Sequence, residues 1–198
     1  MMKKKMILVT SPPACGKTYI SKQLAKRLEH VVYLDKDTLI PLTNRVFAAA
    51  GEEINRSSDF FKKNIRDYEY EVIVDLGLEA LDYDDIVLIN APFTREIRSE
   101  SFLADFQKKL SAKGAVLNVI WVVTDKEICH QRMIARNSVR DTWKLEHWDE
   151  YIGTQDFSIP EPLKKLEGGH DLLLFYNSSD EEYQKSMAEI LPKLEMES

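Results

Sequence analysis

The chain has 198 residues, of which 44% are hydrophobic and 30% are charged, and its formal net charge is −6. This length suits one domain with a sizeable core, and the acidic balance argues against a broad nucleic-acid groove, which would be basic. No stretch approaches the roughly 18 consecutive apolar residues of a membrane span, so we expect a soluble, cytoplasmic protein. Cys15 and Cys129 lack metal-binding spacing, and we expect no disulfide between them in a reducing compartment.

Strand-like and helix-like segments alternate along the chain. Apolar, β-branched runs predict five buried strands, at residues 6–10, 31–35, 86–90, 116–124 and 171–177. Apolar residues at helical spacing predict the intervening helices, over residues 16–30, 38–50, 58–81, 95–112, 124–137 and 180–195. This alternation predicts a three-layer αβα sandwich around a five-stranded, mostly parallel sheet. We expect a single domain over residues 1–198, with a small helical lid at about 130–155.

Two local patterns refine the helices. In the helix predicted over 58–81, five apolar residues lie along one side: Phe61, Ile65, Tyr68, Val72 and Leu76. Thr124 and Glu127 have the spacing of a capping box, which would open the helix that follows the fourth strand. Ligands of such sheets bind outside the carboxyl ends of the strands, and this edge is where we look for the functional residues.

The segment "SPPACGKT" at residues 11–18 lies between the first strand and a helix. It fits the phosphate-loop signature G-x-x-x-x-G-K-[ST], except that Ser11 replaces the first glycine. Prolines carry no N–H, so the nucleotide contacts fall to the residues after them: Ala14, Cys15, Gly16, Lys17, Thr18 and Tyr19. Lys17 would reach the β- and γ-phosphates and Thr18 would hold Mg²⁺. We interpret Cys15 as a small side chain tucked behind the loop.

The loop, "LDKDTLI" at 34–40 and "RMIARNSVRDTWKLEHWDEY" at 132–151 together resemble the P-loop kinases of small substrates. The nearest group contains polynucleotide 5′-kinase-like, chloramphenicol-phosphotransferase-like and AAA_33-type ATP-binding proteins. The resemblance implies ATP and Mg²⁺ as cofactors. It also implies that a carboxylate after the second strand accepts the proton of the acceptor hydroxyl.

Asp37 fits that carboxylate better than Asp35, although Asp37 could instead only cap the following helix. Asp35 is expected to bind Mg²⁺ through water or to orient the loop. P-loop NTPases usually carry a further aspartate at the end of the third strand, but this chain has Asn90 there. An amide is a weaker ligand for a hard cation, which argues against a motor-type ATPase.

Arg132 and Arg136 lie four residues apart on one predicted helical face, and Arg140 follows after a short break. The resemblance implies that Arg132 lies nearer the nucleotide base and that Arg136 and Arg140 lie nearer the phosphates, as catalytic groups. The alternative is a basic helix face neutralised by nearby acids, namely Asp125, Glu127 and Asp141. An amphipathic helix is expected to pack the lid against the body through Trp143, Leu145, Trp148 and Ile152.

These residues favour an ATP-dependent phosphotransferase that acts on a hydroxyl of a small molecule. One alternative is a polynucleotide 5′-hydroxyl kinase, which the acidic net charge makes unlikely, and another is a non-catalytic ATP-binding regulatory module. The acceptor pocket is expected within residues 38–75, where Arg45, Arg56 and Arg66 either grip an anionic substrate or are surface charges. The acceptor and the oligomeric state are left open.

Overall fold

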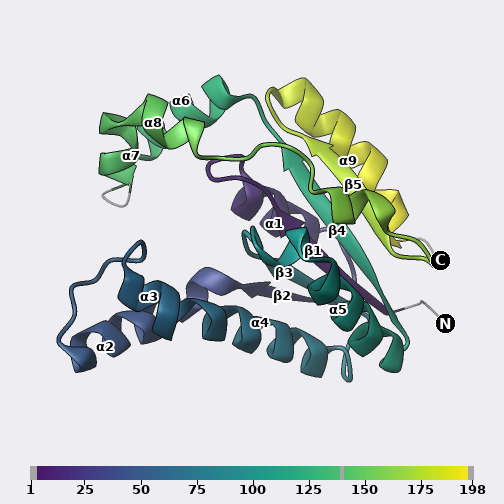
Figure 1. The fold of residues 1–198 in the computed structure, drawn as a ribbon. Helices are drawn as coiled ribbons and strands as arrows, with labels where there is room; N and C mark the ends of the chain where they lie inside the picture. The colour runs from purple at the N-terminus through teal and green to yellow at the C-terminus, as the bar shows by residue number, and fades with distance from the viewer. Residues whose placement is uncertain (1–3, 139–140, 196–198) are drawn as a thin grey trace.

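The computed structural model describes residues 4–138 and 141–195. Five strands form one sheet, parallel throughout, in the order β2-β3-β1-β4-β5 (Figure 1). The strands are β1 (Lys4–Thr10), β2 (Val31–Asp35), β3 (Ile86–Asn90), β4 (Ala115–Val123) and β5 (Asp171–Tyr176). Each lies within two residues of its predicted ends, because β-branched apolar runs favour buried parallel strands.

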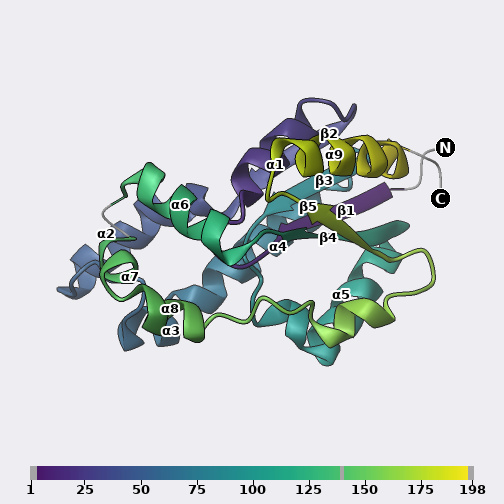
Figure 2. The same ribbon diagram turned by 90° about the horizontal axis from the view of Figure 1, so that it is seen from above.

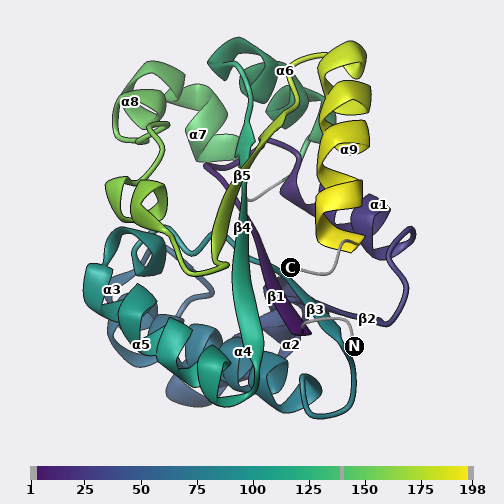
Figure 3. The ribbon, with the colours of Figure 1, turned by 90° about the vertical axis from the view of Figure 1, so that its right-hand side faces the viewer.

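Helices cover both faces of the sheet. One face packs against α4 (Arg66–Ala80) and α5 (Glu100–Ala112), and the other packs against α1 (Lys17–Ala25) and α9 (Asp180–Glu195) (Figures 2 and 3). The remaining helical elements are η1 (Lys36–Leu39), α2 (Ile40–Ala50), α3 (Asp59–Asn64), η2 (Glu96–Arg98), α6 (Lys126–Arg136), α7 (Thr142–Glu146), α8 (Trp148–Gly153) and η4 (Glu161–Lys165). The predicted three-layer αβα architecture is confirmed.

The central strand β1 explains why the sheet needs two helical layers. Met6 and Leu8 pack into the core on the α4–α5 side, whereas Ile7 and Val9 pack into the core on the α1–α9 side. Successive side chains of a strand point to opposite faces, so a strand that is apolar at every position must be covered twice. Each buried aliphatic side chain of this kind stabilises the fold by roughly 1.5–3 kcal/mol.

The single helix predicted over residues 58–81 is wrong, because the chain breaks at Ile65 into α3 and α4. Ile65 lies outside the helical region, with φ −129° and ψ −47°. Its side chain joins Phe47 and Phe61 in a small separate core between α2 and α3. This break allows α3 to turn away from the sheet and, with α2, to form a wall beyond its carboxyl edge (Figure 1).

Within α4, the apolar side noted in the sequence is not the side that the helix buries. Tyr68 is 64% exposed, and Val72 and Leu76 are exposed beside it. The helix buries a different face, which includes Tyr70, Ile73, Val74, Gly77 and Leu78. Gly77 lies on this face, where a Cβ would come within 2.9 Å of Ile89 Cδ1 and 3.0 Å of Met6 Cε, so the helix approaches the sheet closely at this point.

The lid region departs from prediction in two ways. The capping-box prediction is wrong, because Asp125 is the N-cap of α6 and Thr124 donates its hydroxyl to Cys15 O at 3.1 Å. The single amphipathic helix is wrong as well, because α7 and α8 are separated at His147. Tyr151 is buried in α8, whereas Trp143, which was expected to pack, is exposed.

Helices α6, α7 and α8 stand beyond the carboxyl edge of the sheet, across from α2 and α3 (Figure 1). The start of α1 lies between these two groups. Within residues 4–138 and 141–195, no helix is both long enough and apolar enough to cross a membrane.

Candidate active site

A cavity of about 470 Å³ opens at the carboxyl edge of the sheet, between the α6–α8 group and α3–α4. Most of the predicted site residues line it: Ala14, Gly16, Lys17, Thr18, Tyr19, Asp35, Asp37, Arg132 and Arg136. The side chain of Cys15, itself a residue of the phosphate loop, is fully buried. Arg140 lies outside the residues that the structure describes.

The phosphate loop depends on left-handed backbone at two positions, Ala14 (φ 64°) and Gly16 (φ 95°). A Cβ on Gly16 would lie 2.5 Å from Asn177 Nδ2, so glycine is required there for space as well as for conformation. Asn177 follows β5, and its amide donates to Cys15 O at 2.7 Å. The end of β5 therefore holds the loop against the sheet.

Lys17 folds back over the loop. Its Nζ lies 3.4 Å from Ser11 O, 3.3 Å from Ser11 Oγ and 3.2 Å from Pro12 O. Burial lowers the pKa of Lys17, and nearby acidic groups oppose that shift. The three oxygens are uncharged, so they orient the ammonium without neutralising it, and its charge remains available to an anion.

Thr18, Asn90 and Asp35 meet where α1 begins and β2 and β3 end. Asp35 and Asn90 are partners in the β2–β3 register. Asn90 Nδ2 donates to Thr18 Oγ1 at 3.1 Å and to Asp35 Oδ2 at 3.0 Å. Both oxygens thus lie within hydrogen-bond distance of one nitrogen. Asp35, from the neighbouring strand β2, thus brings a carboxylate beside the amide that ends β3.

Asp35 also orders the turn that carries Asp37. Its Oδ1 accepts a hydrogen bond from the N–H of Asp37 at 3.0 Å, and its Oδ2 accepts one from the Tyr33 hydroxyl at 2.9 Å. Asp35, rather than Asp37, is therefore the N-cap of η1. The pKa of Tyr33 is raised by burial and by its bond to Asp35, which keeps the hydroxyl a donor.

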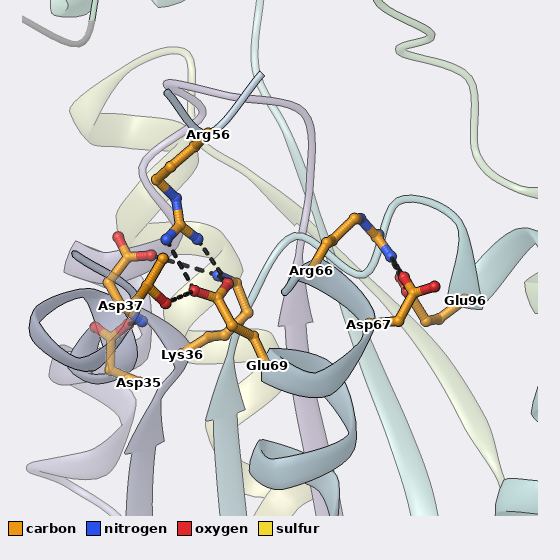
Figure 4. A network of polar contacts seen from close by, with 9 residues as sticks. Asp35, Lys36, Asp37, Arg56, Arg66, Asp67, Glu69 and Glu96 are labelled. Atoms are coloured by element: carbon orange, nitrogen blue, oxygen red, sulfur yellow. Dashed lines mark hydrogen bonds and ion pairs between the residues drawn. The ribbon is translucent and has the colours of Figure 1, made fainter. Parts of the chain in front are cut away.

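Beyond Asp37, the cavity wall is built around the buried carboxylate of Glu69 on α4 (Figure 4). Lys36 Nζ donates to it at 3.0 Å, Arg56 donates with both Nη atoms at 2.8 and 2.6 Å, and Thr43 donates its hydroxyl. Burial alone would raise the pKa of Glu69, but the bonds from Arg56 and Thr43 and the charge of Lys36 bring it down to about 2. Lys36 also lies 3.8 Å from Asp37 Oδ1.

Arg66 extends this wall. Its guanidinium lies 4.4 Å from the centre of the Tyr70 ring and binds Glu96 with both Nη atoms, at 2.8 and 3.2 Å. Arg56 and Arg66 both line the cavity, whereas Arg45 on α2 is exposed and lies outside its lining.

Two arginines of α6 reach the cavity from the lid side. Arg132 Nη2 donates to Asn177 O at 2.7 Å and its Nη1 lies 3.5 Å from Cys15 O, so it ties the helix to the phosphate loop. Arg136 Nε donates to Asp141 Oδ2 at 2.9 Å, and Lys144 donates to the other oxygen of that carboxylate at 3.1 Å. Asp141 is fully buried and pairs with both Arg136 and Lys144. Its single negative charge therefore neutralises only part of their two positive charges.

The comparison that decides the family covers most of the chain. Residues 6–156 match the AAA_33 family model, which is described as an AAA domain. The chain belongs to this AAA-domain family. No curated protein matches this AAA-domain protein at the level required for significance.

Solved structures share the fold of this AAA-domain protein. A putative kinase from Chloroflexus aurantiacus J-10-fl has 18% identity and a TM-score of 0.64, with 98% of this chain and 95% of that chain covered. A chain of the PezAT chromosomal toxin–antitoxin system of Streptococcus pneumoniae has 17% identity and a TM-score of 0.62 (99% and 80% covered). A gluconokinase from Sinorhizobium meliloti 1021 has 14% identity and a TM-score of 0.56 (98% and 95% covered). At these identities the likeness establishes the αβα fold of the P-loop kinases.

Sequence reasoning missed two residues of this AAA-domain site. Asn177 was recognised only as a residue at a strand end, and its clamp on Cys15 O appears only in three dimensions. Glu69 was missed because an acid on an amphipathic helix ordinarily faces solvent. Its one sequence signal is its place on the side of α4 that also carries Tyr70 and Ile73.

Proposed function

We propose that the protein is an ATP-dependent phosphotransferase that moves the γ-phosphate of ATP to a hydroxyl of a small molecule. The observation that carries the proposal is the joint lining of one cavity by the phosphate loop, by Asp37 and by a second wall formed by α3 and α4. A hydrolase needs room only for nucleotide and water, whereas a kinase needs a walled space beyond the γ-phosphate. The kinase names of two of the three similar structures support the same function.

The proposed mechanism assigns one role to each group. Lys17 and the amides of residues 14–18 bind the phosphates at the N-terminus of α1. Asp37 accepts the proton of the acceptor hydroxyl while the hydroxyl oxygen forms a bond to the γ-phosphorus. The bond from that phosphorus to the β,γ-bridging oxygen breaks, and ADP leaves. Arg132 contacts the nucleotide, and Arg136, with Arg140 by resemblance, stabilises the negative charge that develops.

The oxygen atoms around Asn90 fit a hydrated Mg²⁺. Thr18 Oγ1 and Asp35 Oδ2 share one amide nitrogen, and Asn90 Oδ1 is buried with no hydrogen-bond partner among the described residues. A buried acceptor of this kind costs roughly 1–3 kcal/mol unless a donor reaches it, and a metal-bound water is such a donor. We propose that Thr18 holds the ion directly and Asp35 holds it through water. When bound, the ion neutralises phosphate charge.

Two substitutions test the nucleotide and acceptor roles separately. Lys17→Ala is expected to abolish ATP binding in calorimetric titration, whereas Lys22→Ala, an exposed lysine of the same helix, leaves it intact. Asp37→Asn is expected to keep ATP binding and to lower transfer by about 10²–10⁴-fold over a panel of hydroxyl compounds, measured as acceptor-dependent ADP release. Tight ATP binding by Lys17→Ala, or undiminished transfer by Asp37→Asn, would refute the assignment.

The two alternatives are not favoured. A polynucleotide 5′-kinase would need a basic surface around the acceptor, but the cations beyond Asp37 are paired with Glu69 and Glu96. Salt-dependent binding of a short oligonucleotide would reverse this judgement. A non-catalytic ATP-binding module would bind ATP and release no ADP with any acceptor of the panel.

A further inference from the structure

The two cysteines of the chain meet beneath the phosphate loop. Cys15 Sγ and Cys129 Sγ lie 3.5 Å apart, although 114 residues separate them in sequence. Both side chains are buried, with exposed fractions of 0% and 1%. Cys15 belongs to the loop and Cys129 to α6, so the two thiols join the phosphate-binding element to the lid side of the cavity.

The surroundings hold the two sulfur atoms at this junction. The carbonyl oxygen of Cys15 accepts hydrogen bonds from Thr124 Oγ1 at 3.1 Å and from Asn177 Nδ2 at 2.7 Å. Arg132, three residues after Cys129 on α6, reaches the same oxygen with Nη1 at 3.5 Å. Three elements therefore fix the backbone of Cys15 beside α6, and the contact between the thiols is built into the fold.

The environment makes the two thiols unequal. A hydrogen bond from Cys129 and the nearby charge of Lys17 outweigh burial and lower the pKa of Cys15 to about 7. The pKa of Cys129 is raised by the same hydrogen bond and by burial. Of the two thiols, Cys15 is therefore the one that ionises more readily, and Cys129 is the one that keeps its proton. A thiolate beside a protonated thiol is the arrangement in which one sulfur is attacked first and the other completes a disulfide.

We propose that Cys15 and Cys129 form an oxidative modification site, at which hydrogen peroxide converts the pair to a disulfide and closes the loop to nucleotide. The Cys15 thiolate attacks one peroxide oxygen; the O–O bond breaks, and a sulfenic acid and hydroxide form. Cys129 sulfur then attacks the Cys15 sulfur and releases a second hydroxide. With the Cys129 proton and one from solvent, two waters form, so the two thiols lose two electrons to the peroxide.

The disulfide would disturb the nucleotide site through geometry. Its sulfur atoms must come to about 2 Å from each other, so the contact must shorten by about 1.5 Å. Cys15 is followed directly by Gly16 and Lys17, which line the cavity, so a movement of Cys15 toward α6 displaces the residues that would bind phosphate. Ala14 and Gly16 line the cavity with Cys15 beneath them, so the oxidant approaches through the loop. Bound nucleotide should therefore slow the oxidation.

The experiment uses the full chain, hydrogen peroxide and ATP, and it needs no phosphate acceptor. Peroxide is expected to lower the intact mass by about 2 Da, the loss of two thiol hydrogens. A peptide linking Cys15 to Cys129 should appear, ATP affinity should fall at least about tenfold, and dithiothreitol should restore both. MgATP added before peroxide should slow the mass change.

Cys129→Ser is the matched control, and Cys129→Ala serves if the serine variant fails to fold. Either should bind ATP as the wild type does and should form no disulfide. Two thiols that stay free under peroxide would overturn the proposal, as would a disulfide that leaves ATP affinity unchanged. The mapped peptide shows whether the disulfide forms even if the chain binds no nucleotide. Failure of this proposal can therefore be distinguished from failure of the proposed kinase activity.

Discussion

Replacing Glu69 by glutamine tests whether the carboxylate of this residue stabilises the acceptor wall. The substitution keeps the size of the side chain and removes its charge, and it leaves Lys36, whose side chain is only 5% exposed, without a carboxylate partner on α4. The pKa of Glu69 is lowered from 4.5 to about 2. At about 1.4 kcal/mol per unit, this shift corresponds to roughly 3 kcal/mol of folding stability. Breaking a buried ion pair costs about 3–5 kcal/mol, which agrees in size.

The sign of the pH dependence follows from the direction of the shift. Because folding lowers the pKa, the stabilising contribution is fully present above about pH 4.5 and is lost as the pH falls through about 2. The wild type and Glu69→Gln should therefore differ most at pH 7 and should converge in acid, where Glu69 is protonated and resembles glutamine.

Urea unfolding followed by circular dichroism at 25 °C measures the difference. At pH 7 we expect Glu69→Gln to lose roughly 3 kcal/mol, or about 6–12 °C in Tm for a chain of this size. Glu79→Gln, on the exposed side of the same helix, is the matched control and should change stability by less than about 0.5 kcal/mol. A Glu69→Gln loss below about 0.5 kcal/mol at pH 7, or one that does not shrink between pH 4.5 and 3, refutes the reasoning.

Three further substitutions probe the loop, the metal ligands and the core. Asn90→Asp places a carboxylate against Asp35 where an amide donated, so it should cost about 1–3 kcal/mol without metal and should gain more Tm from MgCl₂ than the wild type gains in scanning fluorimetry. Gly16→Ala should lower ATP affinity by more than about tenfold in calorimetry without changing far-UV circular dichroism, because a Cβ meets Asn177 at 2.5 Å. Lys5→Met removes the buried Nζ that donates to the end of α9 at 2.7 Å and should cost about 1.5–3 kcal/mol in urea unfolding.

Each of these predictions has a clear failure. An Asn90→Asp variant indifferent to Mg²⁺ would mean that the ion is not held at this edge. Full ATP affinity in Gly16→Ala would mean that the loop tolerates a side chain. The control is Gly153→Ala, because the Cβ added at Gly153 would meet nothing within 4 Å. Unchanged stability in Lys5→Met would mean that the methylene stem, rather than the ammonium, stabilises the core.

The features that could be predicted from the sequence are those carried by contiguous residues. The strands were predictable because each contains a run of apolar residues, broken in β4 only by Asn118. Asp35, Asn90 and the phosphate loop each follow or end a predicted strand. Because parallel strands share their carboxyl ends, the sequence placed all three at one edge of the sheet. In the structure, all three line the same cavity.

The features that could not be predicted depend on a choice between similar local patterns. Helix α4 carries two apolar ridges, one through Tyr68 and Val72 and one through Tyr70 and Ile73, and spacing does not rank them. The second ridge is buried because it packs against strands from other parts of the chain, and such partners do not appear in the local pattern. The partners of Cys15, like those of Glu69, come from distant segments, so no local pattern contained them.

The buried ammonium of Lys5 also has a consequence for how the chain folds. Lys5 lies in the central strand, but the carbonyl that it reaches belongs to Leu194, 189 residues later in the chain. Its two neighbouring strands likewise come from residues near 86 and 115. Contacts of such long range slow folding, because the intervening chain must be ordered before they form. The strand that leads into the phosphate loop therefore gains this hydrogen bond only after residue 194 has been made.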